Sequence, residues 1–185
     1  MNLQDRLQFE WLALRCQAGD VGAFEDLIAV MEQPLLYYAT SLTGNPESAL
    51  DVLQEVWIKT FRSIRKLKDP GCLRSWLYSI THGIAVDRIR KNTARETAER
   101  VLYEEFDEAE EPSFANEDAA AIHQALGEIG VKHREVLVLH FLEDLSIAEI
   151  ATVVDCSEGT VKSRIHYAKR AMKEVLSGGS YGKEK

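Results

Sequence analysis

Apolar residues recur at three- and four-residue steps along most of the chain, which is the period of an amphipathic helix. Two such runs lie close together near the C-terminal end. Ser146 and Glu149 have the spacing of a capping box, so a helix is predicted to begin there. Asp155 stands where the chain must leave this helix, because aspartate tolerates left-handed backbone geometry better than most residues.

The second run is predicted to form a basic helix. Ser157 is placed to cap it, and the expected buried stripe is Val161, Ile165, Ala168 and Met172. Residues 160–175 contain five Lys or Arg residues and one acid. Two helices joined by a short turn, the second of them basic, are the layout of a helix-turn-helix, whose second helix enters the major groove of DNA. The segment therefore predicts DNA binding, and the alternative is a solvated basic face.

The same helical period continues elsewhere, and strand signals are nearly absent. In the first of the further helices, Pro34 is expected to cause a bend or a restart. Trp57 and Phe61 fall beside the apolar stripe of the second, so both are expected in the core. The predicted fold class is all-α, with these further helices over residues 24–36, 46–65, 76–91, 121–129 and 134–142.

Charge is segregated along the 185 residues, whose net charge is -8. Residues 1–58 carry nine acids and two bases, residues 59–95 two acids and ten bases, and residues 96–118 ten acids and one base. Residues 119–185 carry nine of each. Such segregation indicates several charged partners rather than one uniform nucleic-acid coat.

These patterns divide the chain into two small helical domains joined by an acidic flexible linker. The domains are predicted at 1–95 and 119–177. Residues 96–118 have the composition of a segment without a fixed fold of its own, being acidic and poor in aliphatic residues. Residues 178–185 are predicted to be a flexible tail from their Gly and Ser content.

Several classes of protein are not expected. No stretch approaches the roughly 20 apolar residues that span a bilayer, and the N-terminus lacks the pattern of a signal peptide. The three cysteines are far apart and form no zinc motif, which favours reduced thiols in the cytoplasm. No nucleophile–base constellation or phosphate-binding glycine loop is present, so we expect no enzyme, no metal and no cofactor.

Three blocks of sequence together carry a family resemblance. They are 51–61 (DVLQEVWIKTF), 75–80 continuing to 87–91 (SWLYSI and DRIRK), and 145–173, which includes SEGTVKSR. In this order and separation they resemble an extracytoplasmic-function (group 4) sigma factor of bacterial RNA polymerase, in the sigma-70 family. The resemblance implies a region 2 bundle, a region 4 helix-turn-helix, and a role in binding core polymerase and recognising −10 and −35 promoter elements without catalysis.

The resemblance also implies site residues in the first domain. Asp51, Gln54 and Glu55 would meet the clamp-helix coiled coil of the polymerase β′ subunit, and their spacing puts both carboxylates on one helix face. A solvated acidic face is the alternative. The residues expected to contact −10 DNA are Lys68, Arg74, Arg88, Arg90 and Lys91. Residues 68–75 correspond to the family's loop that captures a flipped base.

In the second domain, carry-over by position puts Lys162, Ser163, His166 and Tyr167 on the surface that faces the −35 groove, and Arg164 and Lys169 on phosphates. The implied partners are promoter DNA, the β′ clamp helices and β flap of core polymerase, and an anti-sigma factor. The free protein is expected to be a monomer that does not insert into membranes.

Two other classes of protein remain as alternatives. A transcriptional regulator of the response-regulator output type would share the helix-turn-helix, but residues 1–95 lack the alternating strands of a receiver domain. A helical adaptor that binds only protein would make the basic stretches incidental. For the acidic linker, occupancy of the polymerase RNA exit path and a solvated spacer are both open.

Overall fold

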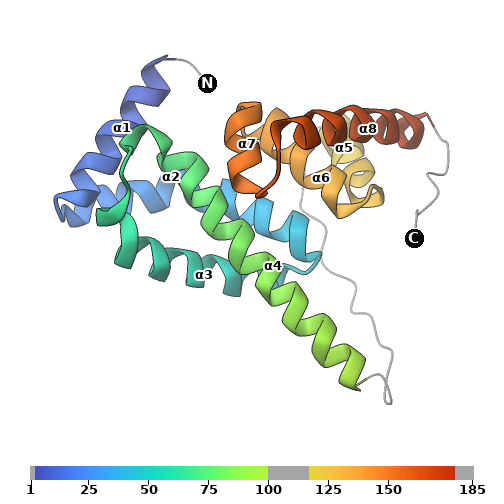
Figure 1. The fold of residues 1–185 in the computed structure, drawn as a ribbon, viewed down its shortest axis with the longest axis horizontal. Coiled ribbons are helices and arrows are strands. Elements are labelled where there is room, and N and C mark those ends of the chain that lie inside the picture. The colour runs from blue at the N-terminus through green and yellow to red at the C-terminus, as the bar shows by residue number, and fades with distance from the viewer. Residues whose placement is uncertain (1–2, 100–116, 178–185) are drawn as a thin grey trace. The chain divides into compact units, whose positions relative to one another are not determined.

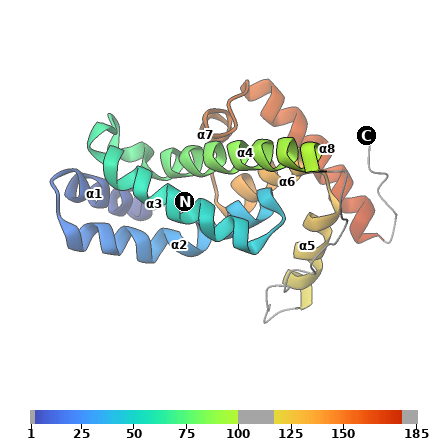
Figure 2. The same ribbon diagram turned by 90° about the horizontal axis from the view of Figure 1, so that it is seen from below.

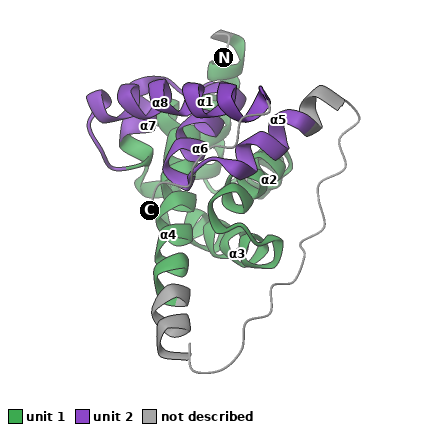
Figure 3. Cartoon of the chain, turned by 90° about the vertical axis from the view of Figure 1, so that its right-hand side faces the viewer, with its two compact units in different colours: residues 1–104, 152–154 green, residues 105–151, 155–185 purple. Residues whose placement is uncertain are grey.

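The structure is a computed structural model, and it describes residues 3–99 and 117–177 (Figure 1). Those ranges contain helices and no strand, which confirms the predicted all-α class. The chain divides into two compact units, residues 1–104 with 152–154 and residues 105–151 with 155–185 (Figure 3). The predicted tail and most of the predicted linker, residues 100–116, lie outside the described residues.

The first unit is built from long helices and two short 3₁₀ turns. Helices α2, α3 and α4 pack against one another, and α1 packs against α2 and the turn η2 (Figure 2). The sequence did not predict α1, and α4 continues four residues past the predicted domain boundary at 95. The elements are α1 (Leu3–Gln17), α2 (Val21–Thr43), α3 (Pro46–Ser63), η1 (Ile64–Lys66), η2 (Pro70–Cys72) and α4 (Leu73–Glu99).

Side-chain caps fix where α2 and α3 begin. Asp20 Oδ1 accepts a hydrogen bond from the N–H of Ala23 at 3.1 Å, and Asn45 Oδ1 accepts one from the N–H of Ser48 at 2.9 Å. Gly44 ends α2 in the left-handed region, at φ +67°, where a Cβ would be strained. Helix α2 runs through Pro34 without the restart that the sequence suggested.

The core of the first unit is centred on two tyrosines. Tyr38 of α2 and Tyr78 of α4 are fully buried, and their rings meet edge to face with centroids 5.4 Å apart. The prediction that Phe61 lies in the core is wrong, because its side chain is 68% exposed. Phe61 contacts the ring of Phe24 at 5.4 Å, but Thr60 is the residue that this last turn of α3 buries.

The second unit packs its long C-terminal helix on two shorter ones. Helix α8 contacts both α5 and α6. Arg134 of α6 donates hydrogen bonds to the carbonyls of Gly127 at 2.9 Å and Ile129 at 3.1 Å, which ties α6 to the end of α5. The elements are α5 (Glu117–Glu128), α6 (Val131–Leu137), a π-helical turn η3 (Val138–Leu142), α7 (Ile147–Val153), of which residues 147–151 belong to this unit, and α8 (Glu158–Leu176).

Candidate functional site

Helices α7 and α8 and the turn between them have the geometry that the sequence predicted. The capping box forms, since the N–H of Ser146 donates to Glu149 Oε2 at 2.9 Å and the N–H of Glu149 donates to Ser146 Oγ at 3.3 Å. Asp155 is left-handed, at φ +48°. Ser157 Oγ then accepts from the N–H of Thr160 at 3.1 Å and starts α8. These contacts confirm the predicted starts of the two helices and the predicted turn between them.

Helix α8 has one buried face and one polar face. Val161, Ile165, Ala168 and Ala171 are buried, and the first three belong to the predicted stripe. The polar side chains exposed on α8 include Lys162, Ser163, His166, Tyr167, Lys169 and Arg170. His166 and Tyr167 meet edge to face with ring centroids 5.5 Å apart. This face, which we call the α8 face, therefore offers cationic, hydroxyl and imidazole groups along one helix.

Arg164 differs from the other predicted contacts on α8. Its Nη1 lies 3.0 Å from Glu135 Oε1 of α6, and the two side chains are 22% and 7% exposed. A carboxylate that is nearly buried needs such a charge partner. The guanidinium of Arg164 is thus engaged inside the second unit, which favours a structural role over a phosphate contact.

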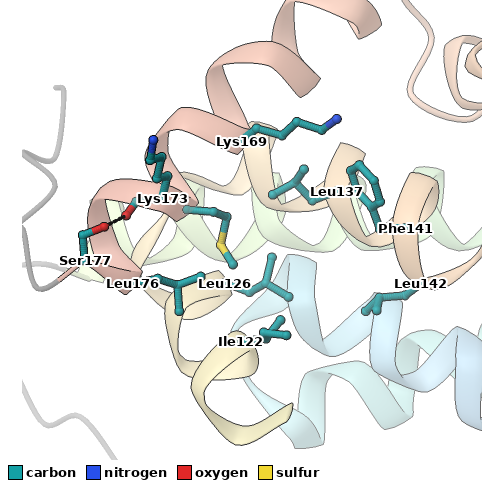
Figure 4. Close-up of a pocket in the computed structure, with 10 residues that line it drawn as sticks. Ile122, Leu126, Leu137, Phe141, Leu142, Lys169, Lys173, Leu176 and Ser177 are labelled. Atoms are coloured by element: carbon teal, nitrogen blue, oxygen red, sulfur yellow. Dashed lines mark hydrogen bonds between the residues drawn. The ribbon is translucent and has the colours of Figure 1, made fainter. Parts of the chain in front are cut away.

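An apolar groove of about 460 Å³ lies beside the α8 face (Figure 4). The groove is not predicted from the sequence, where the adjacent apolar pair Phe141 and Leu142 is its one signal; both side chains are just over half exposed. Lys169 lies at its edge, with Nζ 4.9 Å from the Phe141 ring centre. The groove is lined by Ile122, Leu126, Leu137, Phe141, Leu142, Lys169, Met172, Lys173, Leu176 and Ser177.

In the first unit, the predicted acidic residues share an exposed face of α3. Asp51, Gln54 and Glu55 are all exposed, and the two carboxylates lie one turn apart. Arg88 of α4 reaches both of them, with Nη1 2.9 Å from Asp51 Oδ2 and Nη2 3.5 Å from Glu55 Oε1. Arg88, which is expected to contact DNA, therefore lies against the two acids that are expected to contact core polymerase.

The remaining predicted cations of the first unit are spread over α4 and the loop before it. Lys68, Arg90 and Lys91 are exposed. Arg74 is half-buried, and its guanidinium lies 5.3 Å from the ring centre of Phe9 in α1. Among these residues the structure thus leaves Lys68, Arg90 and Lys91 as the most accessible cations.

The loop between α3 and α4 is held from both sides. Asp69 Oδ1 accepts a hydrogen bond from the N–H of Gly71 at 2.9 Å and caps the turn η2. Gln17 of α1 donates through Nε2 to the carbonyls of Ile64 at 3.2 Å and Leu67 at 2.7 Å. The Asp69 contact lies inside the predicted base-capturing loop, residues 68–75, and the Gln17 contacts fix the residues that lead into it. A defined backbone of this kind is what specific recognition by the loop requires.

Residues 3–99 and 117–177 hold no group of three His, Cys, Asp or Glu side chains that could bind a metal ion. None of the helices in those same ranges combines the length and apolar composition needed to cross a bilayer.

Comparison with known families matches both units. The family model "Sigma-70 region 2" matches residues 27–95, and the model "Sigma-70, region 4" matches residues 119–172. The RNA polymerase sigma-H factor of Pseudomonas aeruginosa is 32% identical over 181 residues, which covers 91% of this chain and 94% of that protein. The ECF RNA polymerase sigma factor SigW of Bacillus subtilis is 28% identical, over 85% of this chain and 91% of that protein.

Two solved structures share the fold. The sigma factor RpoE of Bartonella quintana, solved in complex with the anti-sigma factor NepR, matches with a TM-score of 0.73 at 21% identity, covering 83% of this chain and 96% of that one. CnrH, solved in complex with the cytosolic domain of CnrY, matches with a TM-score of 0.66 at 24% identity, over 92% of this chain and 97% of that one.

Proposed function

This chain belongs to the extracytoplasmic-function sigma factors of bacterial RNA polymerase, and from that premise we propose how its residues divide the work of the family. As a member, it binds core RNA polymerase and directs promoter-specific initiation of transcription. The response-regulator alternative is not favoured, because region 2 of sigma-70 occupies residues 27–95, where a receiver domain would stand.

The second unit is proposed to read the −35 element with the α8 face. The observation that carries this proposal is the exposure of Lys162, Ser163 and His166 on a helix with a fixed, capped start. A helix presented in this way can enter the major groove, where lysine and hydroxyl groups reach base edges. Tyr167 and Lys169 would then lie against the backbone or the flanking bases. Arg164 supports the helix through Glu135.

The first unit is proposed to bind DNA near −10. Of the predicted −10 contacts, Lys68, Arg90 and Lys91 are exposed, and Arg74 belongs to the loop, residues 68–75, that would hold a flipped base. Neutralising phosphates with these cations releases counterions, so this part of the affinity should fall steeply with salt. Arg88 is also predicted to join this set, and its contacts with α3 support a different proposed role, which is argued below.

Two surfaces are proposed to hold core polymerase. The acidic face of Asp51, Gln54 and Glu55 would meet the β′ clamp helices, since exposed carboxylates one turn apart can pair with a basic coiled coil. The apolar groove of the second unit would receive the β flap. Its lining is apolar with Lys169 and Lys173 at the edge, so it fits an amphipathic helix whose polar side is acidic.

The remaining partners follow from the family. We propose that an anti-sigma factor controls this chain, because the similar RpoE and CnrH were each solved with a bound partner, NepR and the cytosolic domain of CnrY. We also propose that the free chain is monomeric, acts in the cytoplasm and has no catalytic activity of its own. The division at 1–95, 96–118, 119–177 and 178–185 stays a prediction.

Run-off transcription with reconstituted holoenzyme tests these assignments on one promoter. Lys162→Ala should lower specific transcription about five-fold or more, because one good base contact contributes at least about 1 kcal/mol of binding free energy. The exposed Lys132 of α6 gives a matched control, and Lys132→Ala should leave transcription unchanged. Asp51→Asn should instead weaken binding of the chain to core polymerase in the absence of DNA. Equal transcription by the Lys162 and Lys132 variants would contradict the proposed −35 role.

A further inference from the structure

Arg88 makes three contacts across the interface between α4 and α3. Its Nη1 lies 2.9 Å from Asp51 Oδ2 and donates to the carbonyl of Ser48 at 3.2 Å, while Nη2 lies 3.5 Å from Glu55 Oε1. The Arg88 side chain is 26% exposed, whereas those of Asp51 and Glu55 are 60% and 57% exposed. The arginine therefore lies behind the two carboxylates, and the carboxylates face the solvent.

We infer that Arg88 is a positioning residue for the polymerase-binding surface, which it serves by holding Asp51 and Glu55 in place on α3. This inference rests on the proposed role of those two acids in binding core polymerase. Arg88 contacts one oxygen of each carboxylate, so each acid keeps a second oxygen for a basic group of the partner. Side chains that are already ordered lose less conformational entropy when the complex forms.

The planar guanidinium suits this task. Its donors lie in a fixed fork, so one side chain can reach two carboxylates and a backbone carbonyl at once. A lysine ammonium is a point charge and cannot reproduce that arrangement. Arg90 and Lys91 follow on the same helix but are exposed, which leaves them available for DNA phosphates. Of the three basic residues Arg88, Arg90 and Lys91 of α4, Arg88 is thus directed to α3 and the other two are exposed to solvent.

Electrostatics and positioning predict opposite effects for the loss of this arginine. If Arg88 only neutralised the acidic face, its removal would increase the negative charge there and strengthen attraction to a basic partner. If Arg88 positions the carboxylates, its removal leaves them charged but mobile, and binding weakens. A third role, as a phosphate contact, would leave core binding alone and reduce the salt dependence of promoter binding.

The test measures two quantities with the full-length chain: its dissociation constant for core polymerase, and the salt dependence of promoter binding by the holoenzyme. Arg88→Gln should weaken core binding about five-fold, the upper range for a partly exposed ion pair. Arg88→Lys should also weaken it, despite keeping the charge. Arg62→Gln removes an exposed charge from α3 and is the matched control for core binding, with no change expected.

Several outcomes would overturn the inference. Tighter core binding by Arg88→Gln would indicate simple neutralisation. Unchanged core binding, with a salt slope reduced by about 0.9, would indicate a phosphate contact, which is the result expected of Arg90→Gln. Full core affinity in Arg88→Lys would show that charge alone suffices.

Combining Arg88→Gln with substitutions of the two acids distinguishes a positioning role of Arg88 from a role in folding. It also distinguishes failure of this inference from failure of the proposed polymerase-binding surface. In a chain already carrying Asp51→Asn and Glu55→Gln, Arg88→Gln should add no further loss of core binding. A loss as large as in the natural sequence would mean that Arg88 only supports the fold. If Asp51→Asn and Glu55→Gln leave core binding unchanged, the proposed polymerase surface itself fails. If these two weaken core binding and Arg88→Gln does not, only the inference about Arg88 fails.

Discussion

The guanidinium of Arg164 lies 3.0 Å from the carboxylate of Glu135, and this pair joins the helix proposed to read DNA to helix α6. The two residues are 29 positions apart in sequence. The pair lets α6 fix the position of α8, and through it the exposed groups of the α8 face.

Breaking this pair should destabilise the second unit. Arg164→Gln removes the Arg164–Glu135 ion pair, whose carboxylate is nearly buried, and we expect a loss of about 2–3 kcal/mol in the free energy of unfolding. Hydrogen exchange of the α6 and α8 amides in the full chain would measure it. Lys162→Gln removes an exposed charge that lies 3.8 Å from Glu158, so its effect should stay within about 0.5 kcal/mol. Equal protection of these amides from exchange in the Arg164 and Lys162 variants would contradict the role of the Arg164–Glu135 pair in fixing α8 on α6.

The turn between α7 and α8 should tolerate only certain residues at position 155. Asp155 has φ +48°, a conformation that β-branched residues strongly disfavour. Asp155→Val should therefore lower the thermal stability of the second unit by about 1–2 kcal/mol. Asp155→Gly should be neutral or stabilising, because glycine adopts this geometry without strain. Similar melting of the two variants, followed by circular dichroism, would contradict the strain argument.

Asp20 should make the first unit sensitive to acid. The N–H of Ala23, followed by the guanidinium of Arg15, lowers the pKa of the Asp20 carboxyl below its ordinary value. A carboxyl with a lowered folded-state pKa stabilises the fold above its unfolded pKa of about 3.9, and that contribution is lost as pH falls further towards the folded value. Asp20→Asn keeps a capping oxygen but cannot titrate. We expect a flatter stability profile below about pH 4 for this variant, measured by urea titration across pH.

The three cysteines should differ in reactivity. Cys16 is buried, and burial raises the pKa of its thiol, so little thiolate forms. Cys72 is exposed in the turn η2, and Cys156 is half-buried. Alkylation under native conditions should label Cys72 first and Cys16 last, with at least a roughly ten-fold difference in rate. Mass spectrometry of digested samples would measure the order, and denatured protein, in which all three should react alike, is the control.

Local features of this fold could be predicted from sequence because local chemistry determines them. The capping box at Ser146, the left-handed turn at Asp155 and the cap at Ser157 each depend on residues within a few positions of one another. The predicted helix periods were correct for the same reason. Helix α1 was missed because Leu7, Trp11 and Leu14 are exposed, so its apolar residues do not mark a single buried face.

Contacts between distant helices could not be predicted in this way. From the sequence, Arg88 is expected to contact −10 DNA and Arg164 a phosphate, because a basic residue on a basic helix carries no local sign of its protein partner. Their carboxylate partners lie on other helices, at Asp51, Glu55 and Glu135, and only the folded chain brings them together. The expectation that Phe61 is buried is wrong because helical periodicity shows which face of a helix is apolar. It does not show how far along the helix the neighbouring elements cover that face.

Gln17 sets a lower limit on the size of a working first unit. Its amide is the donor for the carbonyls of Ile64 and Leu67, so α1 completes the backbone hydrogen bonds of a loop some fifty residues further along. The matched region 2 begins only at residue 27, well after this helix. A fragment trimmed to that boundary would remove the Gln17 donor of the Leu67 carbonyl and leave the Ile64 carbonyl with only the N–H of Leu67. A shortened first unit that keeps this loop intact should therefore retain the C-terminal part of α1, including Gln17.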